Sequence, residues 1–247
     1  MEVLILCGGF ATRLEPITLF VPKPLLPIGG KPILDHIVDD VSGSDISRII
    51  ISTNKKFSDQ FRYWAEMRKA AGMKKRLELV IEPTVHDGHK LGAIKGIQYA
   101  IEKAGIEDDL MIIAGDNFYN SSISPAIEQF KRSGKATVCV HDVGSLEEAR
   151  RFGIVKIEGD VIRAFEEKPE KPSSTLASTG IYIYPKALLP KLKEYLSEKN
   201  NPDAPGYFLK WIIESNEVHA VVQKGEWFDI GTLDTYKKVY SRFSMDS

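Results

Sequence analysis

Short, continuous apolar runs alternate with amphipathic segments through the first half of the chain. The amphipathic segments cover Ile33 to Val41, Ser58 to Ala71 and Leu91 to Ala104, and helical spacing is clearest in the last of them. The apolar runs are typical of strands covered on both faces, and they lie at Val3 to Cys7, Ile49 to Ile51, Leu77 to Ile81 and Leu110 to Ala114. Strand and helix in this alternation predict a parallel sheet with right-handed crossovers.

The pattern changes after Gly115, where strand signals follow one another closely with few helices between them. Such spacing is typical of mixed or antiparallel strands. The signals lie at Ala136 to His141, Gly153 to Ile157, Val161 to Phe165 and Ser178 to Tyr184. The remaining expected elements are a helix near Lys186 to Ser197, a helix through Ile213, a strand at Val218 to Val222 and a closing helix from Leu233.

No linker, internal repeat or low-complexity segment interrupts these elements. The sequence therefore predicts a single α/β domain over residues 1–247. Its expected core is a Rossmann-like open, mostly parallel sheet with helices on both faces, and a smaller mixed β lobe is expected beside it.

Composition and charge narrow the classes of function. With 33 basic and 34 acidic residues, nothing at whole-chain level indicates a nucleic-acid partner or a membrane partner. The N-terminal MEVLILCGG has no basic region before its short apolar run, so a signal peptide is not expected, and no apolar stretch approaches the roughly 20 residues of a membrane span. Cys7 and Cys139 are too few for a disulfide framework, so free thiols and a cytoplasmic location are expected.

The strongest motif is LCGGFATRLEPIT at residues 6–18, directly after the first predicted strand. Ligands of open α/β sheets bind beyond the carboxyl ends of the strands, where this loop emerges. Gly8 and Gly9 permit a sharp turn and expose backbone N–H groups, and Arg13 adds a forked cation suited to phosphate. Paired glycines alone are more often turn formers. The third glycine of a dinucleotide fingerprint and the Gly-Lys-Ser/Thr of a P-loop are both missing.

A proline-rich segment, FVPKPLLPIGGKPILDHI, follows the glycine loop. Pro22, Pro24 and Pro27 are expected to stiffen an extended segment around Lys23 and so fix where its ammonium group points. The alternative is a surface loop with a solvated lysine, the commoner fate of Lys. Its place just after the Arg13 loop favours a functional lysine.

These motifs resemble the N-terminal signature of sugar-1-phosphate nucleotidyltransferases such as glucose-1-phosphate thymidylyltransferase. Gly8-Gly9, Thr12-Arg13-Leu14 and Pro22-Lys23-Pro24-Leu25 match it. The resemblance covers nearly the whole chain in order, through Gly115-Asp116-Asn117, Glu166-Glu167-Lys168-Pro169, Thr179-Gly180 and Trp227-Phe228-Asp229-Ile230-Gly231-Thr232. It implies attack of a sugar-phosphate oxygen on the α-phosphorus of a nucleoside triphosphate, with release of pyrophosphate. The expected partners are that triphosphate and a sugar 1-phosphate.

Two aspartates are candidates for holding a metal. Asp116 follows a buried strand at the carboxyl edge of the predicted sheet, which suits an oxygen ligand of Mg²⁺, and Asp229 stands at an expected buried strand end, where a metal would relieve an unpaired charge. A turn or capping aspartate is the alternative for Asp116. His86, Asp87 and His89 lack a clear further ligand, so a loop without metal is favoured there.

The resemblance implies further roles for particular residues. The resemblance implies that residues 1–115 form mainly the nucleotide-binding half and that residues 116–247 form mainly the sugar-binding half. Arg13 and Lys23 are the expected catalytic residues, and Asp116 and Asp229 the expected Mg²⁺ ligands. The expected nucleotide-binding residues are Leu6, Gly8, Gly9, Thr12, Arg13, Lys23, Gly92 and Asp116. The expected sugar-phosphate-binding residues are Gly153, Glu167, Lys168, Thr179 and Gly180.

The expected product is of the dTDP- or UDP-glucose type, although Gly92 stands where thymidylyl and uridylyl members often place Gln or His. A catalytically silent regulatory homologue that binds sugar nucleotides, and a transferase of the same fold with another phosphorylated acceptor such as phosphocholine, are the alternatives. Some family members carry a left-handed β-helix with acyltransferase activity, and no hexapeptide repeats that would build one are present here. The sequence leaves open whether the chain forms a homo-oligomer.

Overall fold

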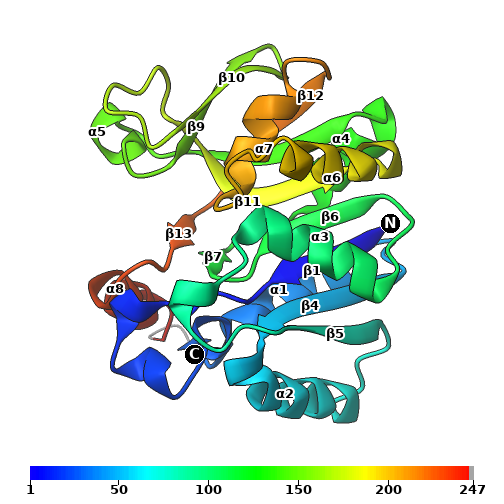
Figure 1. Ribbon diagram of the computed structural model, residues 1–247. Coiled ribbons are helices and arrows are strands. Elements are labelled where there is room, and N and C mark those ends of the chain that lie inside the picture. The colour runs from blue at the N-terminus through cyan, green and yellow to red at the C-terminus, as the bar shows by residue number, and fades with distance from the viewer. Residues whose placement is uncertain (245–247) are drawn as a thin grey trace.

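The computed structural model describes residues 1–244, apart from the side chains of His89 and Ser244. A nine-stranded mixed sheet runs through the whole molecule in the order β5-β4-β1-β6-β11-β8-β12-β10-β9 (Figure 1). Its strands are β1 (Glu2–Leu6), β4 (Arg48–Asn54), β5 (Arg76–Glu82), β6 (Leu110–Ala114), β8 (Ala136–Asp142), β9 (Gly153–Glu158), β10 (Val161–Glu167), β11 (Leu176–Tyr184) and β12 (Val218–Val222).

The strands of the first half are parallel, as the sequence predicts. β1 lies between β4 and β6, and β5 adds to the outer edge of β4, all in the same direction. The second half extends this sheet: β11 runs antiparallel to β6 and β8, and β12 runs parallel to β8. β9 and β10 form an antiparallel pair that makes the far end of the sheet. The predicted α/β fold with a mostly parallel core and a mixed β lobe is confirmed.

Helices cover both faces of the sheet, because each interior strand sends alternate residues to opposite sides. Val3 and Ile5 of β1 pack with helices α1, α2, α4 and α8, whereas Leu4 packs with α3, α6 and α7. The helices are α1 (Ile33–Ser42), α2 (Ser58–Ala70), α3 (Ala93–Ala104), α4 (Ser124–Ser133), α5 (Leu146–Ala149), α6 (Leu189–Ser197), α7 (Pro205–Ile212) and α8 (Leu233–Ser244).

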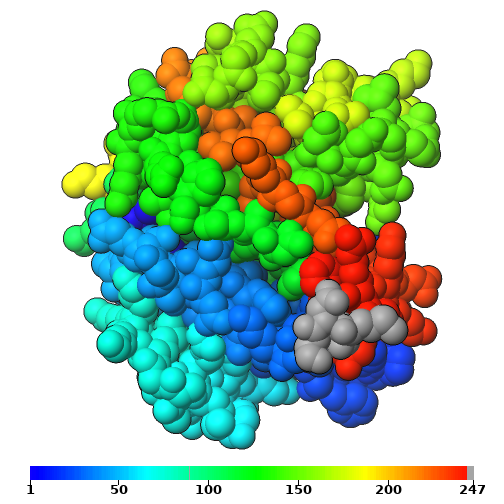
Figure 2. Space-filling model, turned by 180° about the vertical axis from the view of Figure 1, so that it is seen from behind, coloured from blue at the N-terminus to red at the C-terminus, as the bar shows by residue number. Residues whose placement is uncertain are grey.

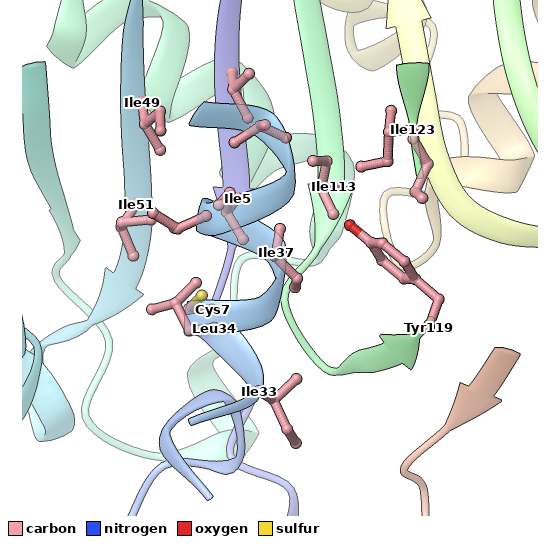
Figure 3. Close-up of a cluster of buried hydrophobic side chains, with 14 of the residues drawn as sticks. Ile5, Cys7, Ile33, Leu34, Ile37, Ile49, Ile51, Ile113, Tyr119 and Ile123 are labelled. Carbon is pink, nitrogen blue, oxygen red and sulfur yellow. The ribbon is translucent and has the colours of Figure 1, made fainter. Parts of the chain in front are cut away.

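Helix α1 anchors the segment that precedes it. Figure 3 shows α1 lying over the strands, with Leu34 beside Cys7 and Ile37 near Ile5 and Ile113. Full burial of each such side chain stabilises the fold by about 1.5–3 kcal/mol. The backbone N–H of Ile33 donates to the Leu26 carbonyl at 3.0 Å. The proline-rich segment before α1 is therefore fixed against the core.

Helix α8 closes over the same segment from the other side. Viewed from behind, α8 in red adjoins the N-terminal segment in blue (Figure 2). The Tyr236 hydroxyl donates to the Pro27 carbonyl at 3.1 Å.

Two short ladders complete the fold: β2 (Pro27–Ile28) with β3 (Lys31–Pro32), and β7 (Asn117–Tyr119) with β13 (Trp227–Asp229). Within residues 1–244, no helix combines the length and the apolar character that crossing a bilayer demands.

Candidate active site

A cavity of about 520 Å³ opens at the carboxyl ends of the parallel strands. The glycine loop after β1, the end of β5 and the start of α3 contribute its walls. Every residue that the sequence assigns to nucleotide binding lines it: Leu6, Gly8, Gly9, Thr12, Arg13, Lys23, Gly92 and Asp116. The structure thus gathers residues far apart in the chain around one space, while their roles stay predictions.

Lys23 projects into this space from a short turn. Lys23–Leu25 form a 3-10 helix that follows the extended Pro22, so the extended conformation expected around Lys23 is wrong. Pro24 fits the first turn of a helix because it needs no backbone N–H there. Lys23 is only 6% exposed, which excludes the alternative of a solvated surface lysine.

The Lys23 ammonium contacts two carboxylates. Its Nζ lies 2.9 Å from Asp116 Oδ2 and 3.9 Å from Asp229 Oδ1. The β7–β13 ladder brings the aspartates together, because it places Asp229 opposite Asn117, the residue that follows Asp116. The structure therefore brings Lys23, Asp116 and Asp229 together in one place, as expected, while the metal-binding role of the two aspartates stays a prediction.

Arg13 adds a second cation to the cluster. A Cβ built on Gly231 would lie 3.6 Å from Arg13 Nη2 and 3.4 Å from Asp229 Oδ2, so Gly231 leaves room for both groups. Burial raises the pKa of Asp229 and the negative charge of Asp116 raises it further, while Lys23 and Arg13 act in the opposite direction. The site therefore holds a buried carboxyl group beside a second acid, and two cations partly offset the cost of charging it.

These two carboxylates fit a magnesium ion. Mg²⁺ is commonly held by one or two carboxylates together with substrate phosphates, rather than by an all-protein cage. Among the residues that the structure describes, no three His, Cys, Asp or Glu side chains gather as a metal cage would require. Of the histidine loop, Asp87 lines the cavity and lies 3.8 Å from Lys90 Nζ, while the side chain of His89 lies outside the described residues.

Gly8 of the loop has a role that the sequence analysis did not predict. The left-handed residue of this loop is Ala11, at φ 49°, and neither Gly8 nor Gly9 has a positive φ. A Cβ on Gly8 would instead lie 2.9 Å from Glu82 Oε1. Glycine at position 8 therefore permits the close approach of a carboxylate. The backbone makes neither a turn nor a bend at Gly8 and Gly9, so the expectation of a sharp turn there is wrong.

Glu82 is a charged cavity residue that the sequence did not reveal as part of the site. It ends β5, lines the cavity and is 8% exposed. Burial raises the pKa of this carboxyl, and a hydrogen bond donated by Ser52 Oγ at 2.9 Å opposes the rise. Its signal was present: it directly follows the apolar run Leu77 to Ile81, at the same edge of the sheet as the glycine loop.

The expected sugar-phosphate residues lie beside the cavity rather than in its lining. Glu167 ends β10 opposite Gly153, and Cβ atoms built on Gly153 and Gly206 would lie 3.1 and 3.0 Å from Glu167 Oε2. Gly206 follows the cavity residue Pro205, which connects the two regions. Burial raises the pKa of Glu167, while Lys168 lowers it. Lys168 is exposed and has a φ of 45°, so the chain bends after the strand.

Thr179 and Gly180 lie close to the Asp116 loop through their backbone. The Thr179 side chain is fully buried, and its hydroxyl donates to the Cys139 carbonyl at 3.2 Å, so it does not face the cavity. Gly180 has a φ of 77°, and a Cβ there would lie 2.8 Å from the Ala114 Cβ. Asn117 Nδ2 donates to the Thr179 carbonyl at 2.9 Å. These contacts fix the loop that carries Asp116.

Two known proteins are similar to this chain over nearly its whole length. A protein of Sulfolobus acidocaldarius described as a mannose-1-phosphate guanyltransferase is 28% identical over 240 residues, which are 97% of this chain and 62% of that protein. A glucose-1-phosphate adenylyltransferase of Clostridium novyi is 32% identical over 255 residues, covering 95% of this chain and 64% of its own length. The chain thus spans just under two-thirds of these two relatives.

A solved structure extends the similarity to the fold. The crystal structure of a Bacillus anthracis protein described as a glucose-1-phosphate thymidylyltransferase, in complex with sucrose, has a TM-score of 0.83 at 26% identity, over 99% of this chain and 95% of that one. The profile of the family described as nucleotidyl transferase matches residues 2–244. The chain therefore belongs to the nucleotidyl transferase family, as its resemblance to the sugar-1-phosphate nucleotidyltransferases predicts.

Proposed function

We propose that the protein transfers a nucleotidyl group from a nucleoside triphosphate to a sugar 1-phosphate and releases pyrophosphate. The observation that carries this proposal is the position of Lys23 Nζ, 2.9 Å from Asp116 and 3.9 Å from Asp229 at one cavity. Transfer of this kind depends on bringing polyanions together and neutralising their charge, and it needs no covalent intermediate on the enzyme. The cluster supplies cations and metal-holding acids for this purpose.

The reaction forms one bond to phosphorus and breaks another. A phosphate oxygen of the sugar 1-phosphate attacks the α-phosphorus, and the bond between that phosphorus and the α–β bridging oxygen breaks. Pyrophosphate leaves with the electron pair of the broken bond. We assign Arg13 to the triphosphate and Lys23 to the reacting and leaving phosphates, where charge on the oxygens must be stabilised.

Asp116 and Asp229 are assigned to Mg²⁺, with Lys23 as their neighbour. The bound ion would supply positive charge to the phosphate oxygens. Because Lys23 already contacts both aspartates, it is held in place before any phosphate arrives. An ordered cation of this kind costs little reorganisation when charge develops.

The neighbouring lobe is assigned to the sugar phosphate. The half-buried Glu167 suits sugar hydroxyls, since a carboxylate accepts hydrogen bonds from them. The exposed Lys168 beside it suits the phosphate. A product of the dTDP- or UDP-glucose type, expected from the sequence, stays a prediction. The identity of the base depends in particular on the residues that line the cavity.

The test is pyrophosphate release across a matrix of substrates. ATP, GTP, CTP, UTP and dTTP would each be combined with glucose 1-phosphate, mannose 1-phosphate, N-acetylglucosamine 1-phosphate and phosphocholine. Turnover with a sugar 1-phosphate and not with phosphocholine supports the proposal, and Lys168→Ala should then raise the KM of the sugar phosphate alone. Tight nucleotide binding without turnover in any combination would instead indicate a regulatory homologue.

A further inference from the structure

We propose that Glu82 reads the base of the triphosphate and selects guanine. This inference rests on the proposed function, and it concerns which nucleoside triphosphate the cavity accepts. It departs from the thymidine or uridine nucleotide that the sequence suggests.

The Glu82 carboxylate occupies a built position in the wall of the cavity. Glycines stand on two sides of it: a Cβ on Gly8 would lie 2.9 Å from Oε1, and a Cβ on Gly96 would lie 3.2 Å from the same atom. Ser52 Oγ donates to Oε1 at 2.9 Å. The hydrogen bond from Ser52 thus orients the carboxylate. Gly8 and Gly96 leave room for it because they carry no side chains.

The strand order separates Glu82 from the phosphate-binding cluster. Glu82 ends β5 and Asp116 follows β6, and β4 and β1 lie between those strands. Three steps between neighbouring strands amount to about 14 Å. Arg13 and Lys23 stand with Asp116 and Asp229 at one end of the cavity, whereas Lys90, which also lines the cavity, lies 3.8 Å from the carboxylate of Asp87.

The other end of the cavity is acidic. Besides Glu82, Asp203 lines it, and a Cβ on Gly92 would lie 3.2 Å from Asp203 Oδ1. The first backbone N–H groups of α3 are already paired, since Ala93 and Ile94 donate to the carbonyls of Asp203 and Pro202. Carboxylates repel a polyphosphate, so this end is suited to the base and ribose and unsuited to phosphate.

The hydrogen-bonding pattern of a carboxylate distinguishes the bases. An ionised carboxylate has about four acceptor positions and no donor, and Ser52 uses one of them. Guanine presents two adjacent donors on its Watson–Crick edge, N1–H and the N2 amino group. Uracil and thymine present one N–H between two carbonyl oxygens, and the carboxylate would repel those two oxygens. Cytosine and adenine each place a ring acceptor beside their amino group. Guanine alone gives Glu82 two donors side by side.

The test is a comparison of kcat/KM for GTP, ITP, dTTP and UTP with whichever sugar 1-phosphate the protein uses. ITP lacks the N2 amino group and keeps N1–H, so GTP should exceed ITP by about tenfold or more, because a buried acceptor would lose its donor. Glu82→Gln presents a donor beside an acceptor, so it should lower the use of GTP and raise the use of dTTP or UTP. Glu66→Gln, on the exposed face of α2, is the matched control and should leave the GTP-to-UTP ratio unchanged.

A higher kcat/KM of the wild-type protein for dTTP or UTP than for GTP would overturn the inference, as would equal use of GTP and ITP. A protein that turns over no triphosphate would contradict the proposed function instead. In that case, calorimetric titration of the wild-type protein with GTP, ITP and UTP in the presence of Mg²⁺ still tests the base. Preferential binding of GTP would support the inference, and equal binding of the three would overturn it.

Discussion

Lys23 and Asp116 form an ion pair at the cavity, with 2.9 Å between Nζ and Oδ2. The lysine side chain is 7% exposed and the aspartate side chain 47% exposed, so the pair joins a buried cation to an acid that solvent and ligands can reach. The ammonium group is shielded from bulk solvent, but a phosphate that enters beside the exposed Asp116 can reach it. The catalytic assignments depend on this arrangement.

Lys23→Ala should lower kcat by about 10²- to 10³-fold, because it removes a positioned charge from the reacting phosphates. The fold should persist, since core residues on both sides of the segment still hold it. Steady-state pyrophosphate release and far-UV circular dichroism measure the two effects. Lys131→Ala, which removes an exposed surface ion pair with Asp45, is the control and should leave kcat unchanged. Near-normal turnover of Lys23→Ala would refute the role given to this lysine.

Mn²⁺ binding to the protein without nucleotide can be followed by electron paramagnetic resonance. Asp116→Asn and Asp229→Asn should each weaken Mn²⁺ binding by at least about tenfold, because each would remove a ligand of the proposed metal site. Lys23→Met should strengthen it, since the competing ammonium is lost. Asp45→Asn, an exposed aspartate outside the cavity, is the control. Mn²⁺ affinity that does not change in any of these variants would place the metal elsewhere.

Thermal stability should depend on pH through Glu82. Burial raises the pKa of Glu82 in the folded protein above its ordinary value of 4.5, so the folded protein binds this proton more tightly than the unfolded chain. The contribution of Glu82 to stability therefore falls as pH rises from that value through the folded pKa. The neutral side chain of Glu82→Gln does not lose stability in this way. The melting temperature of this variant at pH 8 should therefore exceed that of the wild type, by about 2–4 °C for each kcal/mol of difference in the free energy of unfolding. The difference should vanish below pH 4.5. A lower melting temperature at pH 8 would contradict this account.

Gly180 should tolerate substitution worse than Gly159, although both have a positive φ. Alanine at Gly159 meets no atom within 4 Å, so it should cost only the about 1–2 kcal/mol of a left-handed residue. Alanine at Gly180 would also press on Ala114, which should add about 1–3 kcal/mol. Urea unfolding of both variants measures the difference. Equal free energies of unfolding would show that β11 and the Asp116 loop are not closely packed there.

The parallel half of the fold follows from the sequence because its signals are local. The apolar run in β1 and the helical spacing of Ile94 and Ile97 in α3 each describe a single element. Helix α4 was missed although its buried apolar residues Ala126, Ile127 and Phe130 have helical spacing. Its other residues are mostly polar, and it stands among closely spaced strand signals, which favoured an interpretation without a helix.

The part of the candidate site that lies in short sequence motifs could be predicted from the sequence. Arg13, Lys23 and Asp116 stand in short motifs that follow strand ends, and the structure brings them together. The approach of Asp229 depends on the register of β13 with β7, a pairing between distant segments that periodicity cannot reveal. Glu82 belongs to no such motif. Its position after the apolar run Leu77 to Ile81 was a signal in the sequence, but its enclosure by Gly8 and Gly96 depends on packing between distant segments.

Phosphorus NMR of a complete reaction tests the central claim most directly, because it identifies which bond is broken. With the best substrate pair and Mg²⁺, the sugar 1-phosphate signal should disappear. The coupled doublets of a sugar nucleotide and the singlet of pyrophosphate should replace it, and Lys23→Ala should slow the change without altering the products. Nucleoside diphosphate and inorganic phosphate as the products, or an unchanged spectrum with every substrate pair, would contradict the assignment of this site to nucleotidyl transfer.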